Sequence, residues 1–141
     1  MSKCRTGLIV VHGTLYAISL MAANLAFADV VVVASVNSPI NSLSKEQSSD
    51  IFLGKTTSYT PLDQPESSPL REEFYSKVTG KSASQAKSYW SKLSFTGKGT
   101  PPKEGRNSDD IKKQVADNPK LVGYIEKSAV DSSVKVIFAA Q

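Results

Sequence analysis

Cysteine, histidine and methionine are almost missing from this chain of 141 residues. The four residues of these types are Met1, Cys4, His12 and Met21, all near the start. If the segment before residue 29 is removed, the remaining chain cannot form a disulfide, a thiol nucleophile, a histidine-based triad or a soft-ligand metal site. The sequence therefore predicts no metal site, no cofactor and no catalytic residue.

The first 28 residues carry the three parts of a secretory signal peptide. Lys3 and Arg5 precede an apolar run over residues 8–23, and small residues follow up to Ala28. We expect cleavage after Ala28, which leaves residues 29–141 as a periplasmic or secreted protein with no stable membrane insertion. The alternative is an uncleaved anchor, since residues 8–28 are nearly long enough to span a bilayer.

The predicted exported part has little net charge. The chain holds 17 basic and 13 acidic residues, and removing Lys3 and Arg5 leaves 15 against 13, a net charge of +2. The lysines are scattered rather than grouped, so the composition does not favour nucleic acid as a partner. Its 113 residues, 141 less 28, suit one domain with one core.

The order of predicted elements favours an α/β domain. Strands are expected over residues 29–36, 59–62, 121–125 and 134–138. Helices are expected over residues 44–53, 69–79, 82–96 and 107–117, from their caps and terminal glycines. The β-branched run at 29–36 predicts a strand buried on both faces. Helices interleaved with short buried strands predict a mixed, mostly parallel sheet flanked by helices.

A polar turn leading into a helix is the main candidate binding feature. Ser68 is a suitable N-cap and Pro69 a suitable first helical residue, so free N–H groups and the positive end of the helix dipole face the turn at Ser67. Such a helix start can bind an anion. The alternative is that the two serines only cap the helix. Arg71 is either a ligand contact or one half of a surface ion pair.

Three other features were weighed as binding or catalytic sites. Lys98 lies between two glycines in the loop 97–103, which is either a second anion contact or a surface loop. The aromatic helix at 82–96 could offer a stacking platform, although core packing accounts for its aromatics more simply. Adjacent acids at 72–73 and 109–110 point apart on their helices, so they suit dipole stabilisation rather than shared acid–base catalysis. We therefore do not expect an enzyme.

Several of these motifs in order resemble a known family. The segments are 43–47, 50–55, the turn at 67–68, 74–81, 90–99 and 122–125. Together they are similar to the phosphate-binding periplasmic proteins of ABC transporters, and more closely to their short single-domain relatives. The resemblance implies one lobe of a type 2 periplasmic binding protein. It also implies a small oxyanion such as phosphate as ligand, with an ABC permease or a second copy of the chain as partner.

The anion loop departs from the family's pattern. The family's Arg-x-x-Gly-Ser-Gly-Thr falls on residues 64–70, where only Ser68 keeps its type and Gln64 replaces the arginine. A glutamine cannot supply the bidentate charged fork that suits phosphate. We take Ser67 and Ser68 as donors with Gln64, Arg71 and Lys98 as further contacts. The alternative is an interaction or sensory module that kept the fold of the lobe and lost its ligand.

Overall fold

The sheet of this protein combines parallel and antiparallel pairs. The computed structural model describes residues 29–141, so the predicted signal peptide lies outside the described residues. The strands are β1 (Val30–Ser35), β2 (Thr60–Asp63), β3 (Lys103–Glu104), β4 (Leu121–Glu126) and β5 (Val134–Ala140). Their order in the sheet is β3-β2-β4-β1-β5. β2 is parallel to β3 and β4, while β1 is antiparallel to β4 and β5. Four strands thus run one way, which confirms the mixed, mostly parallel sheet.

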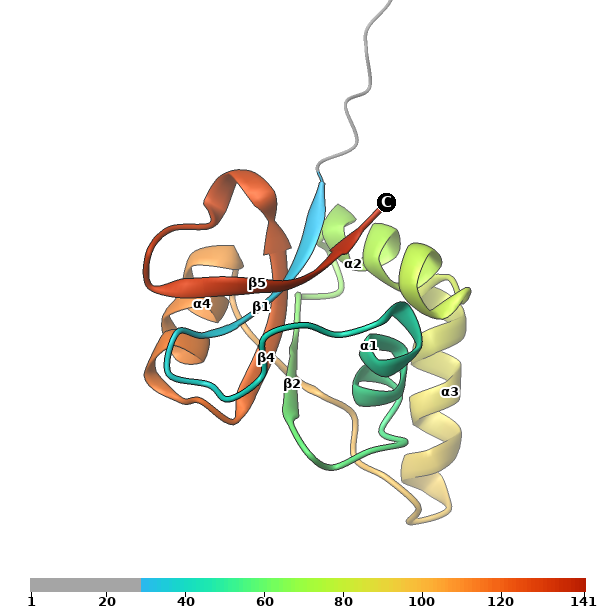
Figure 1. Cartoon of the computed structure of the whole chain (residues 1–141). Coiled ribbons are helices and arrows are strands. Elements are labelled where there is room, and N and C mark those ends of the chain that lie inside the picture. Colours follow the sequence, from blue (N-terminus) through green and yellow to red (C-terminus); the bar gives the residue numbers. More distant parts are fainter. Residues whose placement is uncertain (1–28) are drawn as a thin grey trace, which may run out of the picture.

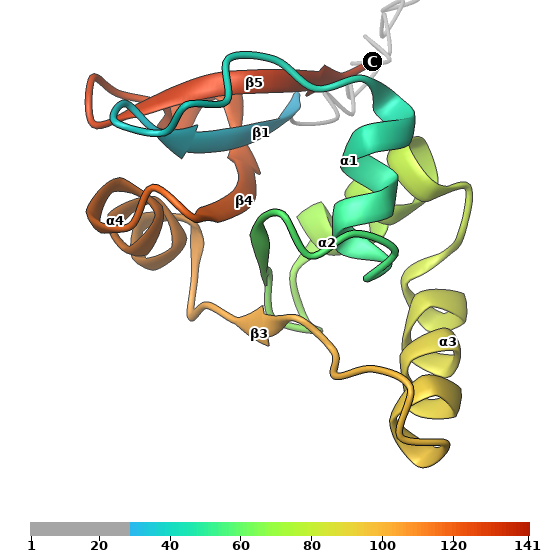
Figure 2. The ribbon, with the colours of Figure 1, turned by 60° about the horizontal axis from the view of Figure 1, so that its bottom comes forward.

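Helices cover both faces of the sheet (Figures 1 and 2). They are α1 (Lys45–Phe52), α2 (Pro69–Phe74), the π-helical turn η1 (Tyr75–Thr79), α3 (Ala83–Phe95), α4 (Ser108–Asp117) and the 3-10 turn η2 (Lys127–Ala129). Helices α1, α2 and α3 lie on one side and α4 on the other. None of the helices in residues 29–141 combines the length and the apolar character that a membrane crossing needs.

Strand β1 lies between two hydrophobic cores. Every residue of Val30–Ser35 is buried. Side chains alternate across a strand, so Val32 packs with Phe52, Phe74 and Tyr124 on one face, whereas Val33 packs with Ile111 on the other. The prediction of a strand buried on both faces is confirmed. The strand ends one residue early, and Val36 is 51% exposed.

The predicted helix starts are confirmed by their caps. Ser44 and Ser82 each accept a hydrogen bond from the third helical N–H in a complete capping box. Asn107 caps α4 by accepting from the Asp110 N–H at 2.9 Å. Ser68 occupies the N-cap position of α2 with Pro69 after it, but its side chain makes no capping bond. The hydroxyl of Ser68 is therefore not needed to start the helix.

Only some of the aromatic side chains of α3 are buried against the rest of the protein. Trp90 is buried and Tyr89 packs at the edge of the core, where its hydroxyl donates to the Leu53 carbonyl at 2.7 Å. Phe95, the third aromatic residue of the helix predicted over residues 82–96, is 94% exposed. Phe95 is the last residue of the helix, and it lies beyond the segments that cover Tyr89 and Trp90.

Candidate functional site

A polar pocket opens where three segments of the chain meet. Its volume is about 650 Å³. It is lined by Gln64, Pro65, Ser68, Pro69, Leu70, Arg106, Asn107, Ser108, Asp109, Glu126 and Ser128. These residues lie between the end of β2 and the start of α2, around the start of α4, and at the end of β4 and just after it. The pocket thus lies at the carboxyl ends of two adjacent parallel strands, the edge at which open α/β sheets usually bind ligands.

The start of α4 supplies hydrogen-bond donors to this pocket. The Asn107 cap satisfies the N–H of Asp110, and the Ile111 N–H donates to the Asn107 carbonyl at 3.0 Å. The N–H groups of Ser108 and Asp109 have no partner within the helix, since the first turn lacks preceding carbonyls. They point out of the positive end of the helix dipole.

Gln64 ties the turn after β2 to α4 and β4. The side chain is 2% exposed, and its amide nitrogen donates to Ser108 Oγ and to the Tyr124 carbonyl, each at 3.0 Å. The Ser108 hydroxyl in turn donates to Glu126. Both amide hydrogens of Gln64 are therefore used within the protein. Gln64 acts as a brace for the start of α4 and not as a donor to a ligand.

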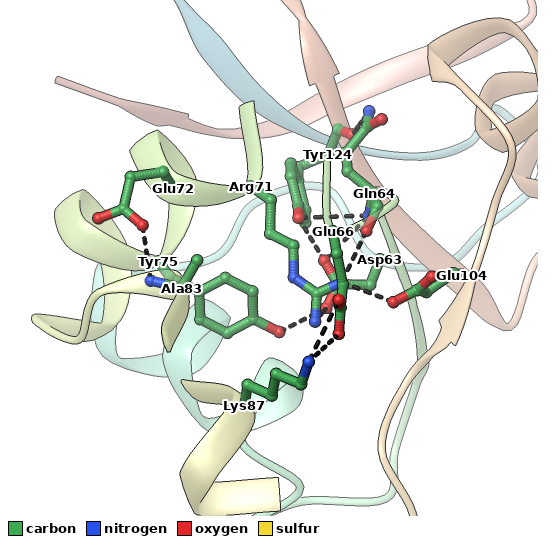
Figure 3. Close-up of polar contacts among 10 residues, drawn as sticks. All are labelled: Asp63, Gln64, Glu66, Arg71, Glu72, Tyr75, Ala83, Lys87, Glu104 and Tyr124. Atoms are coloured by element: carbon green, nitrogen blue, oxygen red, sulfur yellow. Dashed lines mark hydrogen bonds and ion pairs between the residues drawn. The ribbon is translucent and has the colours of Figure 1, made fainter. Parts of the chain in front are cut away.

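Arg71 is held in a buried polar cluster behind the pocket (Figure 3). Its guanidinium donates to the Gln64 carbonyl at 3.0 Å and to Glu104 at 2.6 Å, and lies 3.6 Å from Asp63 Oδ2. The residue is 8% exposed. The sequence left Arg71 as either a ligand contact or one half of a surface ion pair. In the structure Arg71 forms an ion pair, but this pair is buried. The pair fixes the backbone of the turn at Gln64.

Asp63 is the centre of this cluster. It accepts hydrogen bonds from the hydroxyl groups of Tyr124 and Tyr75 and from the Gln64 N–H. Burial raises the pKa of Asp63 above its ordinary 3.8, against the hydrogen bond from Tyr124 and the charge of Arg71. Burial and the nearby Asp63 charge likewise raise the pKa of both tyrosines, so each remains a proton donor.

The predicted site residues do not all come together. Gln64 and Ser68 line the pocket, whereas exposed Ser67 is not among its lining residues. Arg71 faces a neighbouring hollow with Asp63 and Glu104. Lys98 lines a hollow with Thr60, at the beginning of β2, whereas the pocket lies at the end of that strand. The grouping of Lys98 with the serine turn is not supported by this geometry.

Most residues of the pocket, three charged or hydroxyl-bearing ones among them, were missed by sequence reasoning. Arg106, Ser108 and Glu126 line it beside the serine turn. The cap at Asn107 was a signal for the first two, because a capped helix start is itself an anion-binding feature. Glu126 gave no local signal. Within residues 29–141, no group of three or more histidine, cysteine or acidic side chains could hold a metal ion.

Comparison with solved structures identifies the fold. A putative phosphate ABC transporter substrate-binding protein with bound phosphate from Clostridium perfringens matches 77% of this chain with 23% identity and a TM-score of 0.63. An ABC-type phosphate transport receptor from Vibrio cholerae matches the same share with 22% identity and a TM-score of 0.62. PstS from Borrelia burgdorferi gives 11% identity over 77% of this chain and a TM-score of 0.57.

The match covers only part of each of these proteins. It takes in 44%, 45% and 46% of their chains, respectively, so this chain spans less than half of their length. The chain therefore has the fold of one lobe of a periplasmic binding protein, as its motifs predicted. No protein-family model matches the chain, and no curated protein matches it.

Proposed function

We propose that this chain is an exported, non-enzymatic solute-binding-like protein whose pocket binds a small oxyanion, with phosphate as the first candidate. One observation carries the proposal: the free N–H groups at the start of α4, the Ser68 hydroxyl and Arg106 all border one pocket at the carboxyl ends of β2 and β4. In the proposed process, residues 1–28 are removed and residues 29–141 act in the periplasm or outside the cell.

The roles of the predicted residues change in this proposal. Ser68 donates its hydroxyl, which makes no capping bond and is free for a ligand. Toward the oxyanion, Gln64 and Arg71 act indirectly, by fixing the turn and the start of α4. Ser67 and Lys98 are not assigned a contact. An ABC permease or a second copy of this chain is the proposed partner, since this chain spans less than half of the proteins it resembles.

A second candidate function is an interaction or sensory module that uses the same fold without an oxyanion. Two observations favour it. Glu126 and Asp109 bring carboxylates to the pocket, where they repel an anion. Arg71 is committed to Asp63 and Glu104 and cannot turn to a ligand without leaving a buried carboxylate unpaired. This candidate predicts a protein partner and no change of the melting temperature with oxyanions.

Titration calorimetry of the purified chain with phosphate, and with sulfate as control, tests the proposal. We expect saturable phosphate binding tighter than about 0.1 mM, about −5.5 kcal/mol. Ser68→Ala should weaken it by about 0.5 to 1.5 kcal/mol, the net value of a hydrogen bond, without changing stability by more than about 0.5 kcal/mol.

Ser82→Ala is the matched control. It removes the capping bond of α3, far from the pocket, so it should cost about 1 kcal/mol of stability and leave phosphate binding unchanged. Equal phosphate affinity of the Ser68→Ala variant and the unmodified chain would remove the serine turn from the site. No heat with either anion would favour the interaction module.

A further inference from the structure

The pocket lining holds more carboxylates than cations, which limits the kind of ligand that it can bind. One lining residue, Arg106, is cationic, whereas Asp109 and Glu126 are carboxylates. Asp109 has Lys112 at 3.8 Å, and Arg106 has Asp110 at 3.8 Å. Within residues 29–141, Glu126 has no cation within ion-pair distance and accepts one hydrogen bond, from Ser108. A ligand with negative charge alone would leave this carboxylate unpaired and beside a like charge.

Besides the Glu126 carboxylate, the pocket lining holds a second hydrogen-bond acceptor, the side-chain oxygen of Gln64. Gln64 is buried and both hydrogens of its amide are used, on Ser108 and on the Tyr124 carbonyl. Its Oε1 receives no hydrogen bond from any residue between 29 and 141. It is also not one of the two side-chain atoms that these residues enclose without a partner, Ser48 Oγ and Trp90 Nε1. Gln64 Oε1 therefore keeps some contact with solvent, and Gln64 lines this pocket.

The two acceptor residues are linked to each other, and they share the pocket lining with the donors. Ser108 Oγ joins them, since it accepts from Gln64 Nε2 at 3.0 Å and donates to Glu126. The donors are the N–H groups at the start of α4, the Ser68 hydroxyl and Arg106. The lining also holds apolar residues, Pro65, Pro69 and Leu70. Such a lining matches a molecule that carries an anionic group and a hydrogen-bond-donating cationic group on a short apolar linker.

We propose that the pocket binds a small zwitterion in which a phosphonate or phosphate group is joined by a short carbon linker to an ammonium group. The oxyanion lies at the start of α4 with Ser68 and Arg106, and the ammonium group donates to Gln64 Oε1 and Glu126. This inference rests on the proposed oxyanion function and narrows its ligand class. It accounts for Glu126, which a bare anion leaves without a positively charged partner.

Calorimetry with matched ligands tests the inference on the full chain. The probes are 2-aminoethylphosphonate, propylphosphonate, which carries a methyl group in place of the ammonium, and inorganic phosphate. We expect 2-aminoethylphosphonate to bind at least about tenfold more tightly than propylphosphonate, a difference of about 1.4 kcal/mol. O-phosphorylethanolamine carries a phosphate ester in place of the phosphonate. Comparing its affinity with that of 2-aminoethylphosphonate shows which of the two anionic groups the pocket prefers.

The Glu126→Gln variant assigns the ammonium contact. It keeps an acceptor for Ser108 and removes the charge, so the tenfold preference should fall below about threefold while propylphosphonate binds equally well or better. Glu46→Gln makes the same change on exposed α1 and should keep the preference.

The outcomes separate the two proposals. Propylphosphonate or phosphate binding as tightly as 2-aminoethylphosphonate would overturn the zwitterion inference and leave the oxyanion function standing. An undiminished preference in Glu126→Gln would also overturn the assigned contact. No binding of any of the probes would overturn both the inference and the proposed function.

Discussion

Asp63 is the residue on which the arrangement behind the pocket depends most. Its carboxylate accepts from two tyrosine hydroxyls and faces Arg71, which in turn donates to the carbonyl of Gln64. A buried carboxylate with these partners fixes the direction in which the chain leaves β2. It also leaves the protein sensitive to the ionisation of a single group.

The pH dependence of stability should carry the signature of Asp63. Burial raises the folded-state pKa of Asp63 above 3.8. Between pH 3.8 and this raised pKa, the folded chain therefore binds more protons than the unfolded chain. Its contribution is greatest below about pH 3.8 and falls as pH rises through the raised value, by about 1.4 kcal/mol for each pH unit of the window. Asp63→Asn removes this dependence.

The measurement is the difference in unfolding free energy between the unmodified chain and Asp63→Asn, from urea titrations between pH 3.5 and 8. We expect this difference to shrink as pH rises. Asp117→Asn makes the same change at an exposed acid at the end of α4 and serves as the control. A difference that grows with pH would mean that the Arg71 charge outweighs burial.

At the residue scale, the sequence predicted where the helix after the proposed binding turn begins, but not which contacts hold the turn in place. Ser68 and Pro69 mark a helix start by local chemistry alone. The partners of Gln64 lie 44 and 60 positions away along the chain. Such contacts exist only after folding, which is why the bracing role of Gln64 and the place of Glu126 in the pocket were not predicted.

At the element scale, the junction of α1 with α3 depends on a glycine. Gly54 follows α1 with a φ of +70°, a conformation that side chains with a Cβ disfavour. A Cβ there would lie 2.6 Å from the Trp90 ring. Gly80 ends the η1 turn with the same φ, and an added Cβ would meet nothing within 4 Å. The two glycines share a conformational requirement and differ in packing.

Alanine substitutions should separate these two effects. Gly80→Ala should cost about 1 to 2 kcal/mol of stability from backbone strain alone. Gly54→Ala should cost about 1 to 3 kcal/mol more, because Trp90 must shift in a packed site. Urea unfolding of both variants checks this. Equal costs would mean that the ring of Trp90 moves freely.

Element boundaries were predictable to the extent that they are set locally. The caps at Ser44, Ser82 and Asn107 and the stop at Gly80 are sequence signals, and the structure confirms them. Strand β3 was not expected, because its two residues become a strand only by pairing with β2. Nothing within so short a segment distinguishes it from a loop.

At the scale of the whole molecule, α3 lies farthest from the sheet (Figure 2). It is joined to the rest by Trp90 against Gly54, by Tyr89 to the Leu53 carbonyl and by Lys87 to Glu66 at 3.0 Å. Trp90 is the only tryptophan of the chain, so its fluorescence reports on this helix.

We expect α3 to unfold together with the sheet. Ala86 lies in the same core cluster as Val32 and Tyr124, which links the helix to β1 and β4. Trp90 fluorescence and far-ultraviolet circular dichroism should therefore give superimposable urea transitions, as in a two-state domain. A fluorescence transition at lower urea would mean that α3 detaches first.

The architecture as a whole was predictable, whereas the pocket was not. Interleaved helices and β-branched runs such as Val30–Ser35 are enough to predict an α/β layer. The pocket needs the ends of β2 and β4 beside the start of α4. That meeting depends on the strand order, which no single segment encodes.

The position of β1 also has a consequence for when the protein can fold. Within residues 29–141, Val30–Ser35 is the first strand, and it pairs with β4 and β5, the last two. Contacts so distant in sequence slow folding, because a long loop must close before they form. During synthesis the strand has no partner until Leu121–Glu126 has been made. We therefore expect the sheet to stay incomplete until nearly the whole chain has been made, and an incompletely folded polypeptide can still be threaded through a narrow pore.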